Sequence, residues 1–176
     1  MFDLSGKCAL VTGASGGIGG AIARALHAQG AAVALSGTRV QALEDLASEL
    51  GGGAHVIPAD LAERGAAAAL AGQAQEAMGR IDILVNNAGK TRDNLLLRMK
   101  DEEWEDVLEL NLTSAFRLTR AVLRGMMKNR WGRIISITAV VGATGNPGQA
   151  NYSASKAGLA GMTKSIALEI ASRGIT

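Results

Sequence analysis

The stretch Thr12-Gly13-Ala14-Ser15-Gly16-Gly17-Ile18-Gly19 decides the fold of this chain. An apolar run at 8–11 precedes it, and Ile18, Ile22 and Leu26 recur on one face of a predicted helix behind it. A strand, a tight glycine turn and a helix in this order form the setting of a dinucleotide-binding loop. Glycines let the backbone approach a pyrophosphate closely, and the free amides at a helix start attract its charge. A glycine-rich turn by itself is more often only a turn, so the rest of the chain has to support this interpretation.

Apolar runs and helical patterns alternate along all 176 residues. We expect strands at 9–12, 32–36, 55–57, 83–85 and 133–138. We expect helices near 18–29, 40–50, 62–78, 101–128 and 152–172. Strict alternation predicts an α/β fold: a doubly wound parallel sheet of the Rossmann-like type, with right-handed crossovers and helices on both faces. The length fits a single dinucleotide-binding domain over 1–176, which can bury a core without disulfides or metals.

Composition and charge exclude several classes of function. A formal net charge of +2, from basic residues scattered along the chain, does not favour nucleic acid as a partner. The amino terminus lacks the plan of a signal peptide, and no apolar stretch approaches membrane-spanning length, so we expect a cytoplasmic protein without membrane association. Cys8 is the one cysteine, and His27 and His55 have no partners at metal-ligand spacing, so neither a disulfide nor a metal site is predicted.

Two further motifs support the nucleotide-binding interpretation. Ile83-Leu84-Val85-Asn86-Asn87-Ala88-Gly89 predicts a buried strand that ends in a polar turn, at the edge where open parallel sheets bind ligands. Tyr152 and Lys156 are one helical turn apart, so the phenol and the ammonium project from the same face. An adjacent cation favours the phenolate of a tyrosine and brings acid–base catalysis into the neutral pH range.

With these motifs and Asn111 in order, the chain resembles the short-chain dehydrogenase/reductase family over essentially all its residues. Residues 145–152 and 172–176 are most similar to bacterial 3-oxoacyl-(acyl-carrier-protein) reductase. The resemblance implies NADPH-dependent reduction of a 3-oxoacyl thioester, carried on acyl carrier protein, to the 3-hydroxyacyl thioester in fatty acid synthesis. Two alternatives stay open: another short-chain reductase, such as one that acts on acetoacetyl-CoA, and a non-catalytic nucleotide-binding protein.

The resemblance also implies roles for individual residues. Tyr152 would donate a proton to the substrate carbonyl, and Lys156 would favour the phenolate and hold the nicotinamide ribose. Asn111 would hold a water that links Lys156 to solvent. Ala139 stands thirteen residues before Tyr152, where the family has a serine that hydrogen-bonds the developing oxyanion. Because losing such a donor typically lowers turnover about a hundred- to a thousandfold, we expect a catalytically impaired form.

The turn after the second predicted strand bears on the choice of cofactor. A carboxylate there binds the ribose hydroxyls of NAD, whereas residues 36–39 carry no acid and one arginine, Arg39. Arg39 suits the extra phosphate of NADP(H), the cofactor we expect, although many relatives place a basic residue where this chain has Gly16. Asp60-Leu61 matches the family position that flanks adenine, and an aspartate before a helix is equally an ordinary N-cap. The predicted cofactor-binding residues are Gly13, Ala14, Ser15, Gly16, Gly17, Ile18, Gly19, Thr38, Arg39, Asp60, Leu61, Asn87, Ala88, Gly89, Tyr152 and Lys156.

The resemblance extends to partners. Arg130 and Arg173 correspond to docking points for the acidic acyl carrier protein in this subfamily, and we expect them, with Arg133, beside the active face. The predicted helices 101–128 and 152–172 carry apolar residues on more than one face, so we expect a homo-oligomer through them.

Two departures from the family pattern remain. Lys90 stands where relatives commonly have an apolar residue. The sequence ends at 175–176, where the family begins a sixth strand, so we expect a sheet truncated before that strand, with the edge of the fifth strand open.

Overall fold

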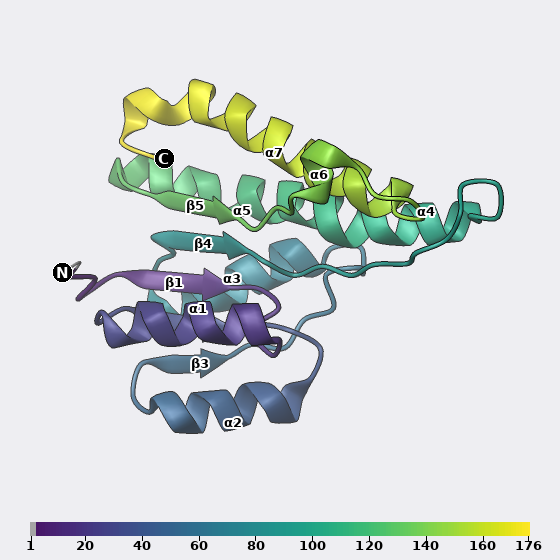
Figure 1. Cartoon of the computed structure of the whole chain (residues 1–176). Helices are drawn as coiled ribbons and strands as arrows, with labels where there is room; N and C mark the ends of the chain where they lie inside the picture. The colour runs from purple at the N-terminus through teal and green to yellow at the C-terminus, as the bar shows by residue number, and fades with distance from the viewer. Residues whose placement is uncertain (1–2) are drawn as a thin grey trace.

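The computed structural model describes residues 3–176 and shows a five-stranded parallel sheet with helices on both faces (Figure 1). The strands are β1 (Cys8–Val11), β2 (Ala32–Leu35), β3 (Ala54–Val56), β4 (Ile83–Asn86) and β5 (Arg133–Ser136). Their spatial order is β3-β2-β1-β4-β5. The predicted doubly wound α/β fold is therefore confirmed. The order reverses beside β1, and the crevice between the ends of β1 and β4 is the point where such sheets bind ligands.

The helices follow the predicted order with three differences. They are α1 (Gly17–Ala28), α2 (Val40–Leu50), α3 (Ala66–Met78), α4 (Asp101–Leu108), α5 (Ser114–Asn129), α6 (Val141–Thr144) and α7 (Ala150–Ile170), with a π-helical turn η1 (Glu109–Thr113) and a 3₁₀ turn η2 (Ala171–Arg173). The helix predicted at 101–128 is interrupted by η1, α3 begins four residues late, and α6 was not predicted. No helix within residues 3–176 is long and apolar enough to cross a membrane.

The central strand β1 supplies both layers of the core, because its four residues are all apolar and buried. Leu10 packs in the cluster that includes α3 and α5, whereas Val11 packs in the cluster that includes α1 and α2. Neighbouring residues of a strand point to opposite faces, so a continuous apolar run suits a sheet covered on both sides. The register aligns Val11 with Leu35 of β2 and Val85 of β4. The loops after these three strands therefore meet at one edge of the sheet.

The outer edge of β5 is paired where the chain passes it again. Ile175 forms a parallel bridge with Gly132. The amide of Thr176 donates to the carbonyl of Gly132 at 3.1 Å, and the amide of Ile134 donates to the carbonyl of Thr176 at 2.9 Å. Residues 175–176 thus lie where the resemblance places the beginning of a sixth strand. The prediction of an open edge is wrong at this point of β5, although Ile135 further along stays exposed.

Candidate active site

The glycine loop joins β1 to α1 in a tight turn that only small residues allow. Gly13 has a positive φ of 62°, which L side chains rarely adopt. An added Cβ at Gly19 would lie 2.2 Å from the carbonyl oxygen of Gly13, so α1 packs directly on the turn. An added Cβ at Gly17 would meet no atom within 4 Å among the described residues. The loop is therefore closed on its inner side and open on the side that faces the cleft.

The hydroxyl of Thr12 connects this loop to the turn after β4. It donates to the carbonyl of Val85 at 3.0 Å and accepts the amides of Asn87 and Ala88, both at 3.0 Å. The side-chain amide of Asn87 donates back to the carbonyl of Thr12 at 2.8 Å. These four bonds hold the ends of β1 and β4 side by side. Thr12 begins the glycine motif, but the sequence alone predicted no role for its hydroxyl.

Tyr152 and Lys156 lie on the first half of α7, on the side that faces the cleft. The Lys156 ammonium is 5.7 Å from the centre of the Tyr152 ring and donates to the carbonyl of Ile137 at 2.8 Å. Lys156 is only 5% exposed, and burial lowers the pKa of its ammonium. A phenol and a buried ammonium this close are equipped for proton transfer.

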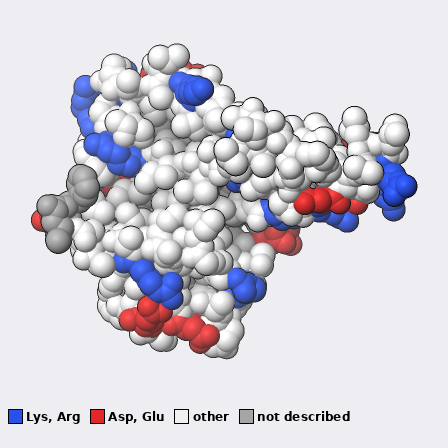
Figure 2. Space-filling view, in the orientation of Figure 1, with Lys and Arg blue, Asp and Glu red and all other residues white. Residues whose placement is uncertain are grey.

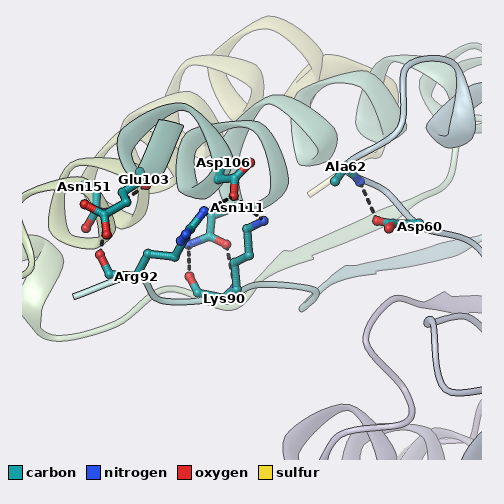
Figure 3. Close-up of polar contacts among 8 residues, drawn as sticks. All are labelled: Asp60, Ala62, Lys90, Arg92, Glu103, Asp106, Asn111 and Asn151. Carbon is teal, nitrogen blue, oxygen red and sulfur yellow. Dashed lines mark hydrogen bonds and ion pairs between the residues drawn. The ribbon is translucent and has the colours of Figure 1, made fainter. Parts of the chain in front are cut away.

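Asn111 lies in η1 and is buried, so the simpler interpretation of a surface asparagine does not hold. Its Oδ1 accepts the amide of Lys90 at 2.8 Å, and its Nδ2 donates to the carbonyl of Lys90 at 2.9 Å (Figure 3). Nδ2 also donates to Oγ of Ser155 at 3.1 Å. The side chain thus clamps the backbone after the Asn-Asn-Ala-Gly turn and touches α7. A π-helical turn at such a place is a frequent feature of functional sites.

Lys90 and Arg92 follow that turn and share one carboxylate on α4. Nη1 of Arg92 is 2.6 Å and Nζ of Lys90 is 3.4 Å from Oδ2 of Asp106 (Figure 3). The hydrogen bond from Arg92, with the nearby charge of Lys90, holds the pKa of Asp106 below its usual value. The unusual lysine at 90 therefore takes part in an ion-pair network that fastens the loop to α4.

Two adjoining clefts run along the carboxyl edge of the sheet. The first, about 380 Å³, lies between the glycine loop, the turn after β4 and α7, and the second, about 240 Å³, continues toward the loops after β2 and β3. The first is lined by Gly13, Gly16, Gly17, Ile18, Gly19, Asn87, Ala88, Gly89, Lys90, Thr91, Ile137, Thr138, Tyr152 and Lys156. The second is lined by Gly13, Ser15, Gly16, Ser36, Gly37, Thr38, Arg39, Ala59, Asp60, Leu61, Ala88, Gly89 and Leu110.

Nearly all the residues predicted to bind cofactor line these clefts. The exception is Ala14, which is buried and whose amide donates to the carbonyl of Ser36 at 2.8 Å. Asn111 and Ala139 do not line either cleft, while Thr138, next to Ala139, does. Two adjoining clefts that share a glycine loop fit an elongated dinucleotide, with one half in each.

The second cleft contains the groups that bear on cofactor choice. The Arg39 guanidinium donates to the carbonyl of Ser15, so it folds back over the glycine loop. Oγ of Ser36 is buried and has no hydrogen-bond partner among residues 3–176. Oδ1 of Asp60 accepts the amide of Ala62 at 3.0 Å (Figure 3) within a turn, and the N-cap residue of α3 is Gly65, so Asp60 is not the helix cap that the sequence left open as the alternative.

The arginines expected beside the active face lie at the opposite end of the sheet. Arg130 ends α5, Arg133 begins β5, and Arg173 ends η2. Figure 2 shows Lys and Arg gathered on the side of the molecule where α5 and α7 finish. Helices that connect parallel strands run antiparallel to them, so the carboxyl ends of α5 and α7 lie at the amino edge of the sheet. The expectation that these arginines lie beside the cleft of the same chain is wrong.

Comparisons with known proteins agree with this geometry. Residues 7–176 match the family model described as short chain dehydrogenase. The chain is 60% identical over 176 residues to nodulation protein G of Rhizobium sp. (strain N33), covering all of this chain and 72% of the relative. It is 52% identical over 174 residues to 3-oxoacyl-[acyl-carrier-protein] reductase FabG of Escherichia coli (strain K12), covering 99% of this chain and 71% of the relative.

The chain therefore belongs to the short-chain dehydrogenase family, whose members are oxidoreductases that bind a nicotinamide cofactor. Among the relatives it matches, it is similar both to FabG reductases and to nodulation protein G, the latter also at 58% identity in Rhizobium meliloti (strain 1021), where it covers 72% of the relative.

Proposed function

We propose that this protein reduces a 3-oxoacyl thioester carried on acyl carrier protein to the 3-hydroxyacyl thioester, with NADPH as the reductant, in the cytoplasm. The observation that carries the proposal is the position of Tyr152 and Lys156 at the same cleft as the glycine loop. The similarity to 3-oxoacyl-[acyl-carrier-protein] reductase supports the choice of substrate. The fold alone does not, because one scaffold hosts many activities.

A nicotinamide held in the first cleft would supply the hydride for the carbonyl carbon. The phenol of Tyr152 donates its proton to the carbonyl oxygen, and the ammonium of Lys156 stabilises the phenolate that remains. At the 5.7 Å between that ammonium and the ring centre, the attraction amounts to about 0.7–3 kcal/mol, depending on the local dielectric. Asn111 would contribute to proton resupply through its position between residue 90 and α7.

Ala139 removes one group from this mechanism. It lies three residues after the end of β5, and its methyl group cannot donate a hydrogen bond to the substrate oxygen. We therefore expect turnover in Ala139→Ser to exceed that of the present chain by about a hundred- to a thousandfold. A panel of 3-oxoacyl thioesters on acyl carrier protein, acetoacetyl-CoA and unrelated ketones tests both substrate and role. Tyr152→Phe in the Ala139→Ser background is the control, and it should abolish the gain.

The alternatives make different predictions in the same experiment. A reductase of acetoacetyl-CoA would prefer the coenzyme A thioester over the same acyl group on acyl carrier protein. A non-catalytic nucleotide-binding protein would gain no turnover from Ala139→Ser on any ketone. Indifference of the Ala139→Ser form to all acyl thioesters, with activity on another ketone, would contradict the proposed substrate.

The choice of NADPH rests on Arg39 and on the absence of an acidic residue at 36–39. The guanidinium lines the second cleft and would have to exchange its bond with the Ser15 carbonyl for one with the phosphate. Hydrogen bonds to charged groups contribute about 1.5–3 kcal/mol, so NADPH should bind roughly ten- to a hundredfold more tightly than NADH. Arg39→Gln should abolish this difference, and equal affinities of the present chain for both cofactors would reverse the assignment.

The same relatives suggest two partners for this protein, an acyl carrier protein and a second copy of the chain. Arg130 and Arg173, at the amino edge of the sheet, suit an acidic carrier protein, and the cleft that such a carrier serves there would be that of a second copy. Phe116 on α5 and Leu168 on α7 are exposed and suit pairing of these helices in a homo-oligomer, whereas Val107 and Leu159 are buried in the chain's own core. Light scattering that shows a monomer at high concentration would contradict the oligomer.

A further inference from the structure

We propose that Asn151 is a positioning residue that fixes the backbone of Tyr152 and ties the first turn of α7 to the loop after β4. The proposal rests on the role given to Tyr152 above. Asn151 directly precedes the tyrosine and is 0% exposed, so its amide must find its partners inside the protein. It lies in the stretch 145–152 that carries the resemblance to the reductase, but the sequence assigned it no role.

The oxygen of the Asn151 side chain supplies a hydrogen-bond acceptor that the backbone lacks at the start of α7. The first amides of a helix have no acceptor within the helix, and Tyr152 is the third residue of α7. The Tyr152 amide donates to Oδ1 of Asn151 at 2.7 Å. Within the described chain, the N-cap residue Gln149 makes no side-chain cap. Asn151 therefore performs the capping role from inside the first turn, at the residue whose phenol faces the cleft.

The nitrogen of the same side chain joins α7 to two other segments. Nδ2 donates to the carbonyl of Arg92 at 2.9 Å and to the carbonyl of Glu103 at 3.0 Å (Figure 3). Arg92 lies in the loop after β4, and Glu103 lies on α4. Both hydrogens and the oxygen of the amide are used, so an alanine would deprive the buried Tyr152 amide of this acceptor and remove one donor from each of the two carbonyls.

Ser155 and Asn111 hold the same turn from its other side. Oγ of Ser155 donates to the carbonyl of Tyr152 at 2.7 Å and accepts Nδ2 of Asn111 at 3.1 Å. Asn111 in turn grips both backbone groups of Lys90. The backbone of Tyr152 is thus held at its nitrogen and at its oxygen, and both contacts lead to residues 90–92. The loop after β4 and the catalytic turn move as one unit in this arrangement.

The experiment compares two asparagines in the full chain carrying Ala139→Ser. Asn151→Ala should lower kcat by roughly ten- to a hundredfold, because a displacement of about 1 Å in a catalytic group has that effect. The KM of the thioester and the Kd of NADPH should stay within about threefold, since the clefts are unchanged. Asn94→Ala is the matched control: Nδ2 of Asn94 donates to the Arg98 carbonyl at 3.0 Å and to Glu103 at 3.1 Å in the same loop, without touching Tyr152. Its kcat should stay within about twofold.

A second variant covers the case in which Asn151→Ala does not fold. Asn151→Asp keeps the acceptor for the Tyr152 amide but presents a carboxylate to the carbonyls of Arg92 and Glu103. Protonation of that carboxyl restores one donor. The kcat of Asn151→Asp relative to its parent should therefore rise as the pH falls through the pKa of the introduced carboxyl. A constant ratio across this pH range would overturn the proposal.

Two further outcomes are decisive. Equal losses of kcat in Asn151→Ala and Asn94→Ala, or a loss confined to KM, would overturn the positioning role.

If the Ala139→Ser parent reduces no thioester, the proposed function has failed, and a spectroscopic measurement tests the role of Asn151 separately. Tyr152 is the only tyrosine of the chain, so the near-ultraviolet tyrosine signal reports on it alone. Asn151→Ala should change this signal, Asn94→Ala should not, and an unchanged signal in Asn151→Ala would overturn the proposal.

Discussion

Gly17 and Gly19 lie two residues apart at the start of α1, and we predict opposite results when a methyl group is added at each. A Cβ at Gly19 would lie 2.2 Å from the Gly13 carbonyl oxygen and 2.7 Å from Nδ2 of Asn87. Ordinary contacts begin at 3.4 Å, so the loop and α1 would have to separate by more than an ångström. Overpacking of this kind costs about 1–3 kcal/mol, which for a chain of this size lowers the Tm of Gly19→Ala by roughly 2–12 °C.

The same substitution at Gly17 should leave the fold intact and damage binding. No described atom lies within 4 Å of the added Cβ, and alanine is favoured over glycine in a helix by up to about 1 kcal/mol. The Tm of Gly17→Ala should therefore equal or exceed that of the parent. Gly17 lines the first cleft, where the methyl group would occupy the space in which the backbone approaches a pyrophosphate. We expect the Kd of NADPH to rise at least about tenfold, or about 1.4 kcal/mol.

Differential scanning calorimetry and a fluorescence titration with NADPH measure the two effects independently of turnover. Both variants differ from the parent by the same single carbon, so each is the other's control. Gly17→Ala with unchanged affinity would show that the glycine loop does not hold the pyrophosphate. Gly19→Ala with unchanged Tm would refute the close packing of α1 on the turn.

Three further predictions test the interior of the site. Burial lowers the pKa of Lys156 from 10.5, so the penalty for its charge is full below the lowered pKa and vanishes above 10.5. Lys156→Met should thus raise the free energy of urea unfolding at neutral pH, and a decrease would contradict this reasoning. Thr12→Val should cost about 1–3 kcal/mol in the same unfolding experiment, because the amides of Asn87 and Ala88 lose their acceptor, whereas Thr12→Ser should be near neutral. Burial raises the pKa of the Cys8 thiol, so alkylation of the native protein should follow global unfolding, and rapid alkylation would show that β1 opens locally.

The sheet could be predicted from the sequence because its signals are local. Each strand is a short apolar run bounded by glycine or polar residues, and the predicted and observed boundaries differ by two residues or fewer. The alternation of these runs with helical patterns determines a parallel sheet, which in turn places the glycine loop and the Asn-Asn-Ala-Gly turn at one edge. The position of the clefts follows from that, and every residue predicted to bind cofactor except Ala14 lines one of them.

The π-helical turn η1 could not be predicted, because it depends on contacts between distant segments. The sequence 101–128 has continuous helical periodicity, and a turn with i→i+5 bonds has no separate pattern of apolar residues. In the structure Asn111 reaches the backbone of Lys90 from this turn, and that contact joins residues 21 apart in the chain. Nδ2 of Asn151 likewise donates to two carbonyls that lie 48 and 59 residues away in the chain.

The end of the sheet at which Arg130 and Arg173 lie could have been derived from the sequence. Once the strands are parallel, every connecting helix must run back, and a residue at the end of such a helix lies at the amino edge. Arg173 ends the turn that continues the 21-residue α7, which at about 1.5 Å per residue carries it roughly 30 Å from the tyrosine end of that helix. The resemblance to the reductase subfamily identified Arg130 and Arg173 as docking residues. The topology of the sheet, however, determines the cleft near which a partner bound to them would lie.

Ala139, at the position where the resemblance implies a serine, lies in an otherwise intact frame. Lys156 still bonds the Ile137 carbonyl two residues before Ala139, and the Tyr152 backbone is still held at its nitrogen and oxygen. Because α6 follows with the Gly142 amide bonded to the Ala139 carbonyl at 3.0 Å, the backbone at 139 is fixed by its own turn and not by the missing hydroxyl. Ala139→Ser therefore adds a donor to a backbone that is already placed, with no repacking required. Recovery of turnover without a change in the Kd of NADPH is the outcome that this arrangement requires.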